Sequence, residues 1–120
     1  MANMSNYLMG KVVDSIRDTS FLALYRSNPS ASDTGMEVGS AGYARQKIDF
    51  VVKDVGILQN TTSIIFPSIA DGYGNVTHVG VRDAQYGGNL LFFKSLSEPF
   101  FSERGGSIKI DSGGLKISLD

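Results

Sequence analysis

His78 is the first residue to consider for chemistry, because the sequence contains no other histidine and no cysteine. A histidine acts as a general base only within hydrogen-bond reach of the group that it deprotonates. His78 lies in an alternating run at 76–81, and no Gly-x-Ser-x-Gly nucleophile motif is present, since the segment 39–42 is one residue too short. The absence of thiols also excludes thiolate zinc sites. We therefore expect no catalytic residue, and we predict a structural or subunit-contact role for His78.

Acidic and amide side chains surround a glycine-rich turn at 71–75 and offer the second candidate site. Asp71, Asn75 and Asp83 carry oxygen atoms that Ca²⁺ prefers, but their spacing does not match an EF-hand loop, which ends on a glutamate. We interpret them as solvated turn residues and expect no metal and no cofactor. A pair of glycosidase carboxylates meets in space rather than in sequence, so that alternative stays open.

Composition and charge narrow the classes of partner. The chain has 120 residues and a formal net charge of −1, and its lysines and arginines are scattered singly, which argues against nucleic-acid binding. No segment approaches the roughly 20 apolar residues of a membrane span. Polar residues interrupt 1–18, so we expect no signal peptide and synthesis in a cytoplasm. A chain of this length predicts a single domain over 1–120.

The first segment predicts a helix over 5–18. Leu8, Val12 and Ile16 recur every four residues and form an apolar stripe. Ser5 or Asn6 can cap the start of this helix, because either side chain accepts a hydrogen bond from an unpaired backbone N–H.

After Ser20 the apolar period changes to two, which predicts strands between 21 and 119. The segment 21–25 is apolar on both faces and is expected at the centre of a sheet, whereas 27–42 is a long polar loop. The glycine pair at 87–88 and the Asp-Ser-Gly-Gly segment at 111–114 indicate hairpin turns. About seven short strands between turn signals favour a mainly β fold, an antiparallel β-sandwich of jelly-roll type. The expected strands cover 21–25, 43–52, 63–66, 76–82, 89–96, 107–110 and 115–119, and the expected core residues are Ile48, Phe50, Val79, Val81, Leu90, Phe92, Ile108, Ile110 and Ile117.

An aromatic run from 90 to 101 is the most apolar part of the chain. We expect Leu90 and Phe92 in the core, while core packing and a subunit contact are equally good explanations for Phe100 and Phe101. Arginine and aromatic residues are favoured at the centres of interfaces. The predicted contact residues are Tyr25, Tyr43, Arg45, Phe100 and Phe101, with 28–42 as an arm that reaches a neighbouring subunit.

Several short motifs occur in an order that resembles one protein family. They are LALY at 22–25, SNP at 27–29, GYARQ at 42–46, VTHVGV at 76–81, GGNLL at 87–91 and GGLKISL at 113–119. Together they make the chain similar to small virion structural proteins of tailed bacteriophages, often labelled tail fibre or minor tail proteins. The similarity extends over about 5–120.

The resemblance implies a non-enzymatic virion protein made in the bacterial host cytoplasm. Small β-sandwich virion proteins also serve as capsid decoration or cement, and multivalent attachment would let weak contacts stabilise a shell. The leading prediction is therefore a capsid cement protein that binds the major capsid protein as a dimer or trimer. The first alternative is a tail fibre, minor tail or tail-tip component that binds other tail proteins. The second alternative is a carbohydrate-binding module for host recognition, which would need exposed aromatics beside acids.

Overall fold

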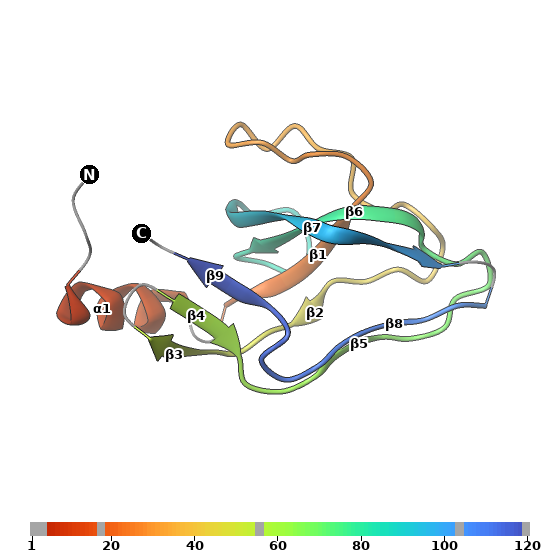
Figure 1. The fold of residues 1–120 in the computed structure, drawn as a ribbon. Helices are drawn as coiled ribbons and strands as arrows, with labels where there is room; N and C mark the ends of the chain where they lie inside the picture. Colours follow the sequence, from red (N-terminus) through yellow and green to blue (C-terminus); the bar gives the residue numbers. More distant parts are fainter. Residues whose placement is uncertain (1–4, 17–18, 55–56, 103–104, 119–120) are drawn as a thin grey trace.

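The computed structural model describes residues 5–16, 19–54, 57–102 and 105–118, with the backbone alone at Met9, Val13, 52–54, 97–98, 101–102 and 117–118 (Figure 1). Within these residues the chain forms one helix and nine strands, which confirms a mainly β fold. The elements are α1 (Asn6–Ile16), β1 (Phe21–Tyr25), β2 (Gln46–Lys47), β3 (Phe50–Asp54), β4 (Ile57–Asn60), β5 (Ile64–Phe66), β6 (Gly74–Arg82), β7 (Leu90–Ser102), β8 (Ile108–Ile110) and β9 (Lys116–Ser118).

The helix α1 begins at the predicted cap. The backbone N–H of Leu8 donates to Ser5 Oγ at 3.2 Å, which places Ser5 in the N-cap position. The helix packs beside β3 at one end of the molecule. The last turn enters the core, since Ile16 is buried, whereas Leu8 in the first turn is exposed. In the described part of the chain, no helix is long and apolar enough to span a membrane.

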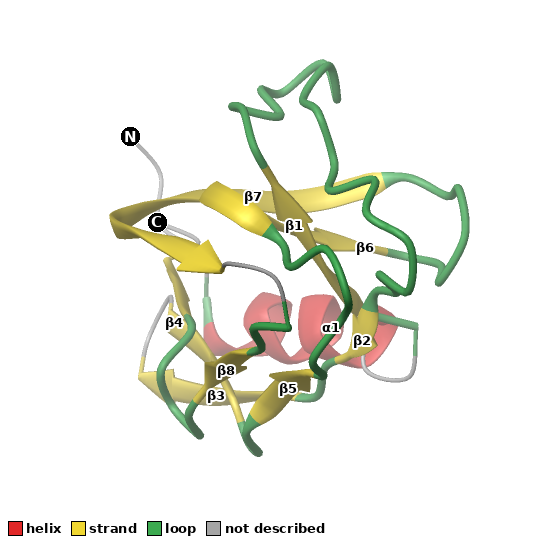
Figure 2. Cartoon of the chain, turned by 90° about the vertical axis from the view of Figure 1, so that its right-hand side faces the viewer, coloured by secondary structure: helices red, strands yellow, loops and turns green. Residues whose placement is uncertain are grey.

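All strand pairs are antiparallel and belong to three sheets. The largest sheet has the order β2-β1-β6-β7, so β1 is central, as its two apolar faces predicted. A three-stranded sheet, β3-β4-β9, and the pair β5-β8 form the layer on the other side of the core (Figures 1 and 2). This arrangement agrees with antiparallel layers, while the jelly-roll order of strands stays a prediction.

The segment 43–52 is not one strand, contrary to its clean alternation. It divides into β2 and β3, which belong to different sheets, and buried Ile48 lies between them with its N–H donating to Ser20 O at 3.0 Å. The sequence patterns also did not predict β4, and they predicted too short a strand in place of β7, which continues through Pro99. An edge strand tolerates proline, because the missing N–H can face away from the sheet.

The turn at 111–114 is not a hairpin either. The strand before it, β8, pairs with β5, whereas the strand after it, β9, pairs with β4. Buried Asn60 connects the two pairs, since its Nδ2 donates to Asp111 O at 2.9 Å and to Thr62 O at 2.8 Å. Its Oδ1 accepts the N–H of Leu115 at 2.9 Å. These bonds satisfy a buried amide and set the point where the chain changes sheets.

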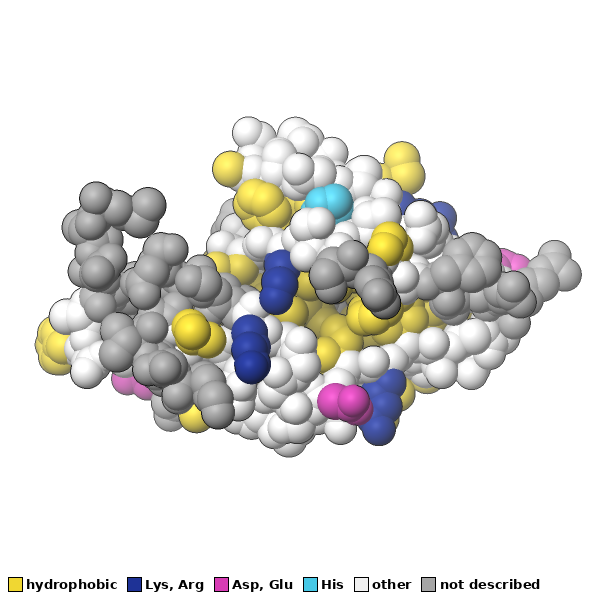
Figure 3. Space-filling model, viewed as in Figure 1, with side chains coloured by type: hydrophobic (Ala, Val, Ile, Leu, Met, Phe, Trp, Pro, Cys, Tyr) yellow, Lys and Arg dark blue, Asp and Glu magenta, His cyan; other side chains and the backbone are white. Residues whose placement is uncertain are grey.

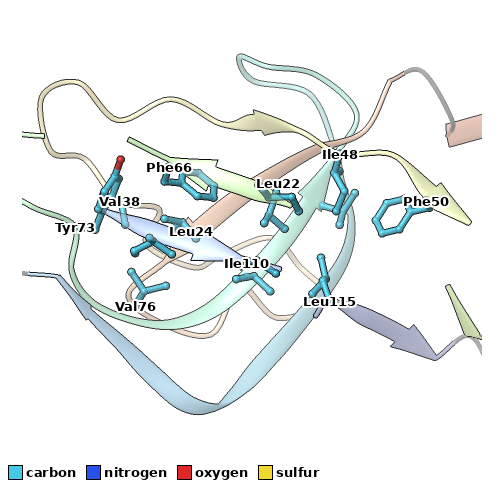
Figure 4. Packing of buried hydrophobic residues seen from close by; sticks show 14 of the residues in the cluster. Leu22, Leu24, Val38, Ile48, Phe50, Phe66, Tyr73, Val76, Ile110 and Leu115 are labelled. Carbon is cyan, nitrogen blue, oxygen red and sulfur yellow. The ribbon is translucent and has the colours of Figure 1, made fainter. Parts of the chain in front are cut away.

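The core lies between the large sheet and the opposite layer (Figure 4). Leu22 and Leu24 point into it from β1, and the rings of Tyr43, Phe66 and Tyr73 form a cluster with centroids 6.0 to 6.4 Å apart. The burial predicted for six residues is confirmed: Ile48, Phe50, Val79, Val81, Ile108 and Ile110.

Leu90 and Phe92 are less buried than predicted. Both side chains are only half-buried, and Phe92 packs against the margin of the core. The reason is that β7 is the outermost strand of its sheet, and no other described strand pairs with its far side. The prediction for Ile117 falls on a side chain outside the described part.

Candidate functional site

The loop 27–42 folds back on its own sheet. Its returning half pairs with β1, because Arg26 N donates to Met36 O at 2.8 Å and Val38 N donates to Leu24 O at 2.9 Å. Figures 1 and 2 show the loop above the sheet on the side opposite the core. In the single chain the loop therefore forms a second layer on the outer face of the sheet, and its contact with a neighbouring subunit stays a prediction.

Tyr25 explains why the loop must lie there. Side chains alternate along a strand, so Tyr25 points away from the core that Leu22 and Leu24 enter. It is nevertheless only 1% exposed, because the loop covers it. Gly80 on the neighbouring strand leaves room for the ring, since a Cβ there would lie 2.7 Å from Tyr25 Cε2.

Arg82 fastens this loop to the turn at 83–89. Its Nη1 and Nη2 donate to the two carboxylate oxygens of Asp33 at 2.7 and 2.8 Å. Nη1 also donates to Tyr25 Oη at 3.0 Å, while Nη2 and Nε donate to Gly88 O and Gly87 O at 2.9 and 3.3 Å. Arg82 is 7% exposed, so its buried charge is matched by a carboxylate and its N–H groups are engaged.

Arg45 makes a second, parallel connection. Its Nε and Nη2 each donate at 2.8 Å to the carboxylate of Glu37, and Nη1 donates to Ala84 O at 3.0 Å and Gly87 O at 2.7 Å. Tyr43 Oη donates to the same carboxylate at 2.5 Å. Arg45 and Arg82 together hold three segments, 27–42, 43–45 and 83–89, and we call this structure the arginine clamp.

The ionisation of the clamp follows from these contacts. Hydrogen bonds from Arg82 lower the pKa of Asp33. Burial opposes ionisation of Glu37, but hydrogen bonds from Arg45 and Tyr43 outweigh it and lower the pKa of Glu37. Burial and the bond to Glu37 raise the pKa of Tyr43. At neutral pH both carboxylates are therefore charged and each is neutralised by one arginine.

A surface hollow of about 220 Å³ opens beside the clamp. Tyr86 is the most exposed large apolar residue on its border, with 81% of its surface accessible. Gln85 is also exposed, and neither side chain bonds to another described residue. The hollow is lined by Glu37, Tyr43, Arg45, Gln85, Tyr86 and Gly87, among others.

A second surface feature lies between β7 and the start of β9. Figure 3 shows apolar side chains in a strip across the middle of one face, with lysine or arginine side chains beside it. Phe92 and Phe93 of β7 line a small apolar depression together with Leu115 of the segment before β9. Lys94 Nζ bridges the gap by donating to Lys116 O at 3.0 Å. This seam is narrow and largely filled, so it is the weaker candidate.

The predicted contact residues separate into two groups. Tyr25, Tyr43 and Arg45 meet in the clamp, where the side chain of Tyr25 is buried in the single chain, and their contact roles stay predictions. Tyr43 and Arg45 line the hollow with limited exposure. Phe100 is half-buried against the core, and the side chain of Phe101 falls outside the description.

Sequence reasoning missed Asp33, Glu37, Arg82 and Tyr86. Asp33 and Arg82 are 49 positions apart in the sequence, so no local pattern predicts that they pair. Tyr86 could have been found from the sequence, because it directly precedes the glycine pair at 87–88 and is therefore expected on a turn.

His78 takes no part in this site. It is half-buried on β6, and its Nδ1 lies 2.8 Å from Thr77 Oγ1. In the described ranges no three histidine, cysteine or acidic side chains are grouped to hold a metal ion.

Comparison with models of known protein families gives a match over nearly the whole chain. A family model described as "Podophage GP4 fiber I protein gp80" matches residues 2–118, almost the whole chain. No curated protein matches the chain. The match confirms the resemblance to virion structural proteins of tailed bacteriophages.

Proposed function

The chain belongs to the podophage GP4 fiber I protein gp80 family, and we propose that it is a structural component of the phage fibre that works through contacts alone. The match to 2–118 carries this proposal, because it covers the entire described domain and names a fibre protein. The family match by itself supports the assignment to virion structural proteins. The position on the fibre and the absence of chemistry are the proposed parts.

The geometry of the clamp supports a role in presenting a surface. Two bidentate arginine–carboxylate pairs fix the loop 27–42 and the turn 83–89 before any partner arrives. A surface that is ordered in the free protein loses little entropy on binding. This is a useful property for a protein whose exposed loops make the contacts.

The same contacts argue against hydrolysis at the loops. Asp33 and Glu37 are each held by an arginine at neutral pH, and both have lowered pKa values. A glycosidase acid needs a raised pKa, so that it carries a proton to donate. The proposal is contradicted if the purified chain hydrolyses a cell-envelope polymer and loses that activity on Glu37→Gln or His78→Ala.

Capsid cement, the leading prediction from sequence, is the alternative position. The family description supports the fibre instead, because it names a fibre protein. Quantitative gel analysis of purified virions separates the two. A copy number far below that of the major capsid protein, with immunogold label at the tail, supports the fibre. A copy number comparable to the major capsid protein contradicts it.

A homo-oligomer remains part of the proposal. Fibres are built from repeated subunits, and cyclic symmetry is the usual arrangement of identical chains. Light scattering of the purified chain should give the mass of a dimer or trimer at micromolar concentration. A strictly monomeric chain would contradict this part and leave the virion role intact.

A further inference from the structure

The strand β7 forms the outer edge of the largest sheet, and no other described strand pairs with that edge. We propose that residues 92–95 of β7 bind an extended segment of another virion protein, which alternates acidic and apolar residues and adds a strand to the sheet. The proposal deepens the fibre role by naming a contact surface, and it rests on that role for the source of the partner.

The backbone of β7 supplies the binding groups. In an antiparallel pair, the N–H and C=O groups of alternate residues point away from the neighbouring strand. Such an edge is a template for a further strand. The pairing of β7 with β6 is regular over four consecutive residues, from Phe92 opposite Val81 to Ser95 opposite His78. This stretch therefore presents its free backbone groups at the regular spacing that an added strand needs.

The rest of β7 is less suited to this pairing. The register with β6 shifts between Leu90 and Phe92, and it shifts again between Ser95 and Phe100. Pro99 lies in the second irregular stretch and has no N–H to donate. Bulges and prolines are devices that protect edge strands from pairing. The binding stretch is thus confined to 92–95, and the partner contributes about four paired residues.

The seam beside this stretch is too small for a separate ligand, but it leaves the edge accessible. Phe92, Phe93 and Leu115 border a depression of about 10 Å³, which has room for roughly one water molecule. In the described part, β7 and β9 form no strand pair with each other. Instead, Lys94 Nζ donates to Lys116 O at 3.0 Å across the seam. Lys94 is exposed, so its side chain can move aside for an added strand.

The charges at the seam favour an acidic partner. Lys94 and Lys116 are both exposed, and neither forms an ion pair with an acidic residue among those described. An acidic side chain opposite Lys94 would replace the bond to the Lys116 carbonyl with a charge-assisted one. Opposite charges on neighbouring strands stabilise an antiparallel sheet.

Phe93 explains why the partner alternates in character. Successive side chains point to opposite faces of a strand, so Phe93 and Lys94 lie on different faces. Phe93 is 42% exposed, and an apolar side chain on the added strand would cover it. The partner therefore places acidic residues on the face of Lys94 and apolar residues on the face of Phe93. In edge pairing of this kind, backbone bonds give affinity and the alternate side chains give specificity.

A second copy of this chain is a poorer partner, because its edge strands carry lysine. The outermost strands β2, β8 and β9 contain Lys47, Lys109 and Lys116. Pairing of one of these strands, or of a second β7, with 92–95 would bring like charges together near Lys94, which opposes association. The other two outermost strands, β3 and β5, pack beside α1 and β2.

The test uses the full chain and short capped peptides as the probe. One set alternates glutamate with valine, isoleucine or phenylalanine, and a matched set has lysine in place of glutamate. A third set repeats the glutamate peptides with N-methyl groups on the backbone, which keeps the side chains and removes the donors. We expect the glutamate peptides at millimolar concentrations to shift the ¹⁵N–H signals of 92–95 and to slow hydrogen exchange at alternate residues. The other two sets should not do so.

Variants then test the charge. Lys94→Glu should weaken binding of the glutamate peptides about tenfold or more, and it should allow the lysine peptides to bind. Lys11→Glu is the matched control, because it makes the same change of charge at an exposed position on α1 and should leave binding unchanged. The proposal is overturned if no glutamate peptide shifts 92–95, if the N-methyl peptides bind equally well, or if Lys94→Glu binds the glutamate peptides like the wild type.

Pairing between two copies would give a different result. Protection of 92–95 that rises with protein concentration, without any peptide, would assign the edge to a second copy and overturn the proposal. In purified virions, a photo-crosslinker in place of Ser95 should join the chain to a different protein, and cross-links to another copy alone would also overturn it. The fibre role is decided by location and copy number, so the two proposals fail independently.

Discussion

The loop end and the interior of this domain are stabilised in different ways. In the interior, apolar side chains such as Phe66 are enclosed on all sides, and the contribution depends on filled volume. At the loop end, Arg45 and Arg82 satisfy specific oxygen atoms, and the contribution depends on the number and direction of hydrogen bonds. The interior therefore tolerates residues of similar size, whereas the loop end tolerates few substitutions at its two arginines.

Tyr43 connects the two regions. Its ring stacks on Phe66 with centroids 6.3 Å apart, and its hydroxyl donates to Glu37 in the clamp. The backbone N–H of Leu24 also donates to this hydroxyl at 3.1 Å. A change in the packing of the core can thus reach the clamp through one side chain.

The largest expected effect is in the interior. Phe66→Ala should lower the free energy of unfolding by about 3–5 kcal/mol, because it leaves a cavity in a closed core. Phe92→Ala should cost clearly less, since Phe92 is half-buried at the sheet edge. Urea unfolding of both variants tests the distinction. Equal losses would mean that the edge of the sheet is as closed as its centre.

The next largest effect is at Arg82. Arg82→Ala should cost about 3 kcal/mol, near the low end for breaking a buried ion pair because Asp33 is partly exposed. Arg82→Lys should recover little of this loss, since a lysine has no planar fork for the two Asp33 oxygens.

The control for Arg82 is an exposed pair on the same domain. Lys109 Nζ lies 3.7 Å from Asp111 Oδ1, and both side chains are mostly exposed. Lys109→Ala should change stability by less than about 1 kcal/mol. If Arg82→Lys keeps wild-type stability, the clamp depends on charge alone and the contrast with the core is weaker than stated.

Asn60 provides an intermediate case, a polar side chain in the interior. Asn60→Ala should cost about 1–3 kcal/mol, because it leaves the Leu115 N–H and the Asp111 carbonyl without their partner. Exchange of the Leu115 amide with deuterium should accelerate at the same time. A neutral substitution would show that water replaces the amide at this junction.

The smallest effect is on pH dependence. The pKa values of Asp33 and Glu37 are lowered from ordinary values of 3.8 and 4.5. Their contribution is therefore complete above these ordinary values, and it is lost as pH falls through the lowered ones. Unfolding measured from pH 7 down to pH 3 should show a shallower loss in an Asp33→Asn, Glu37→Gln double variant than in the wild type. Parallel curves would mean that the clamp carboxylates do not contribute.

Local patterns predicted the parts of the fold that depend on neighbours in sequence. The Ser5 cap, the central strand β1 and the glycine turn at 87–88 each have a local cause, and each is present. The break at Ile48 could not be predicted, because the alternation continues across it while the chain changes sheets.

The candidate site was less predictable for the same reason. Tyr43 and Arg45 were singled out as contact residues by type, and they do line the hollow. Their partners, Glu37 and the turn carbonyls, are chosen by the folded loop, and Arg82 meets Asp33 only because β6 lies beside β1. The burial of Tyr25 under the loop 27–42 could not be predicted either, because it depends on how that loop folds back over the sheet.

A reconstruction of the intact virion by cryo-electron microscopy tests the central claim most directly. The account predicts density for this domain, about 44 × 28 × 26 Å, on the fibre in the tail region. Density for the domain repeated over the capsid shell, and absent from the tail, would contradict the account.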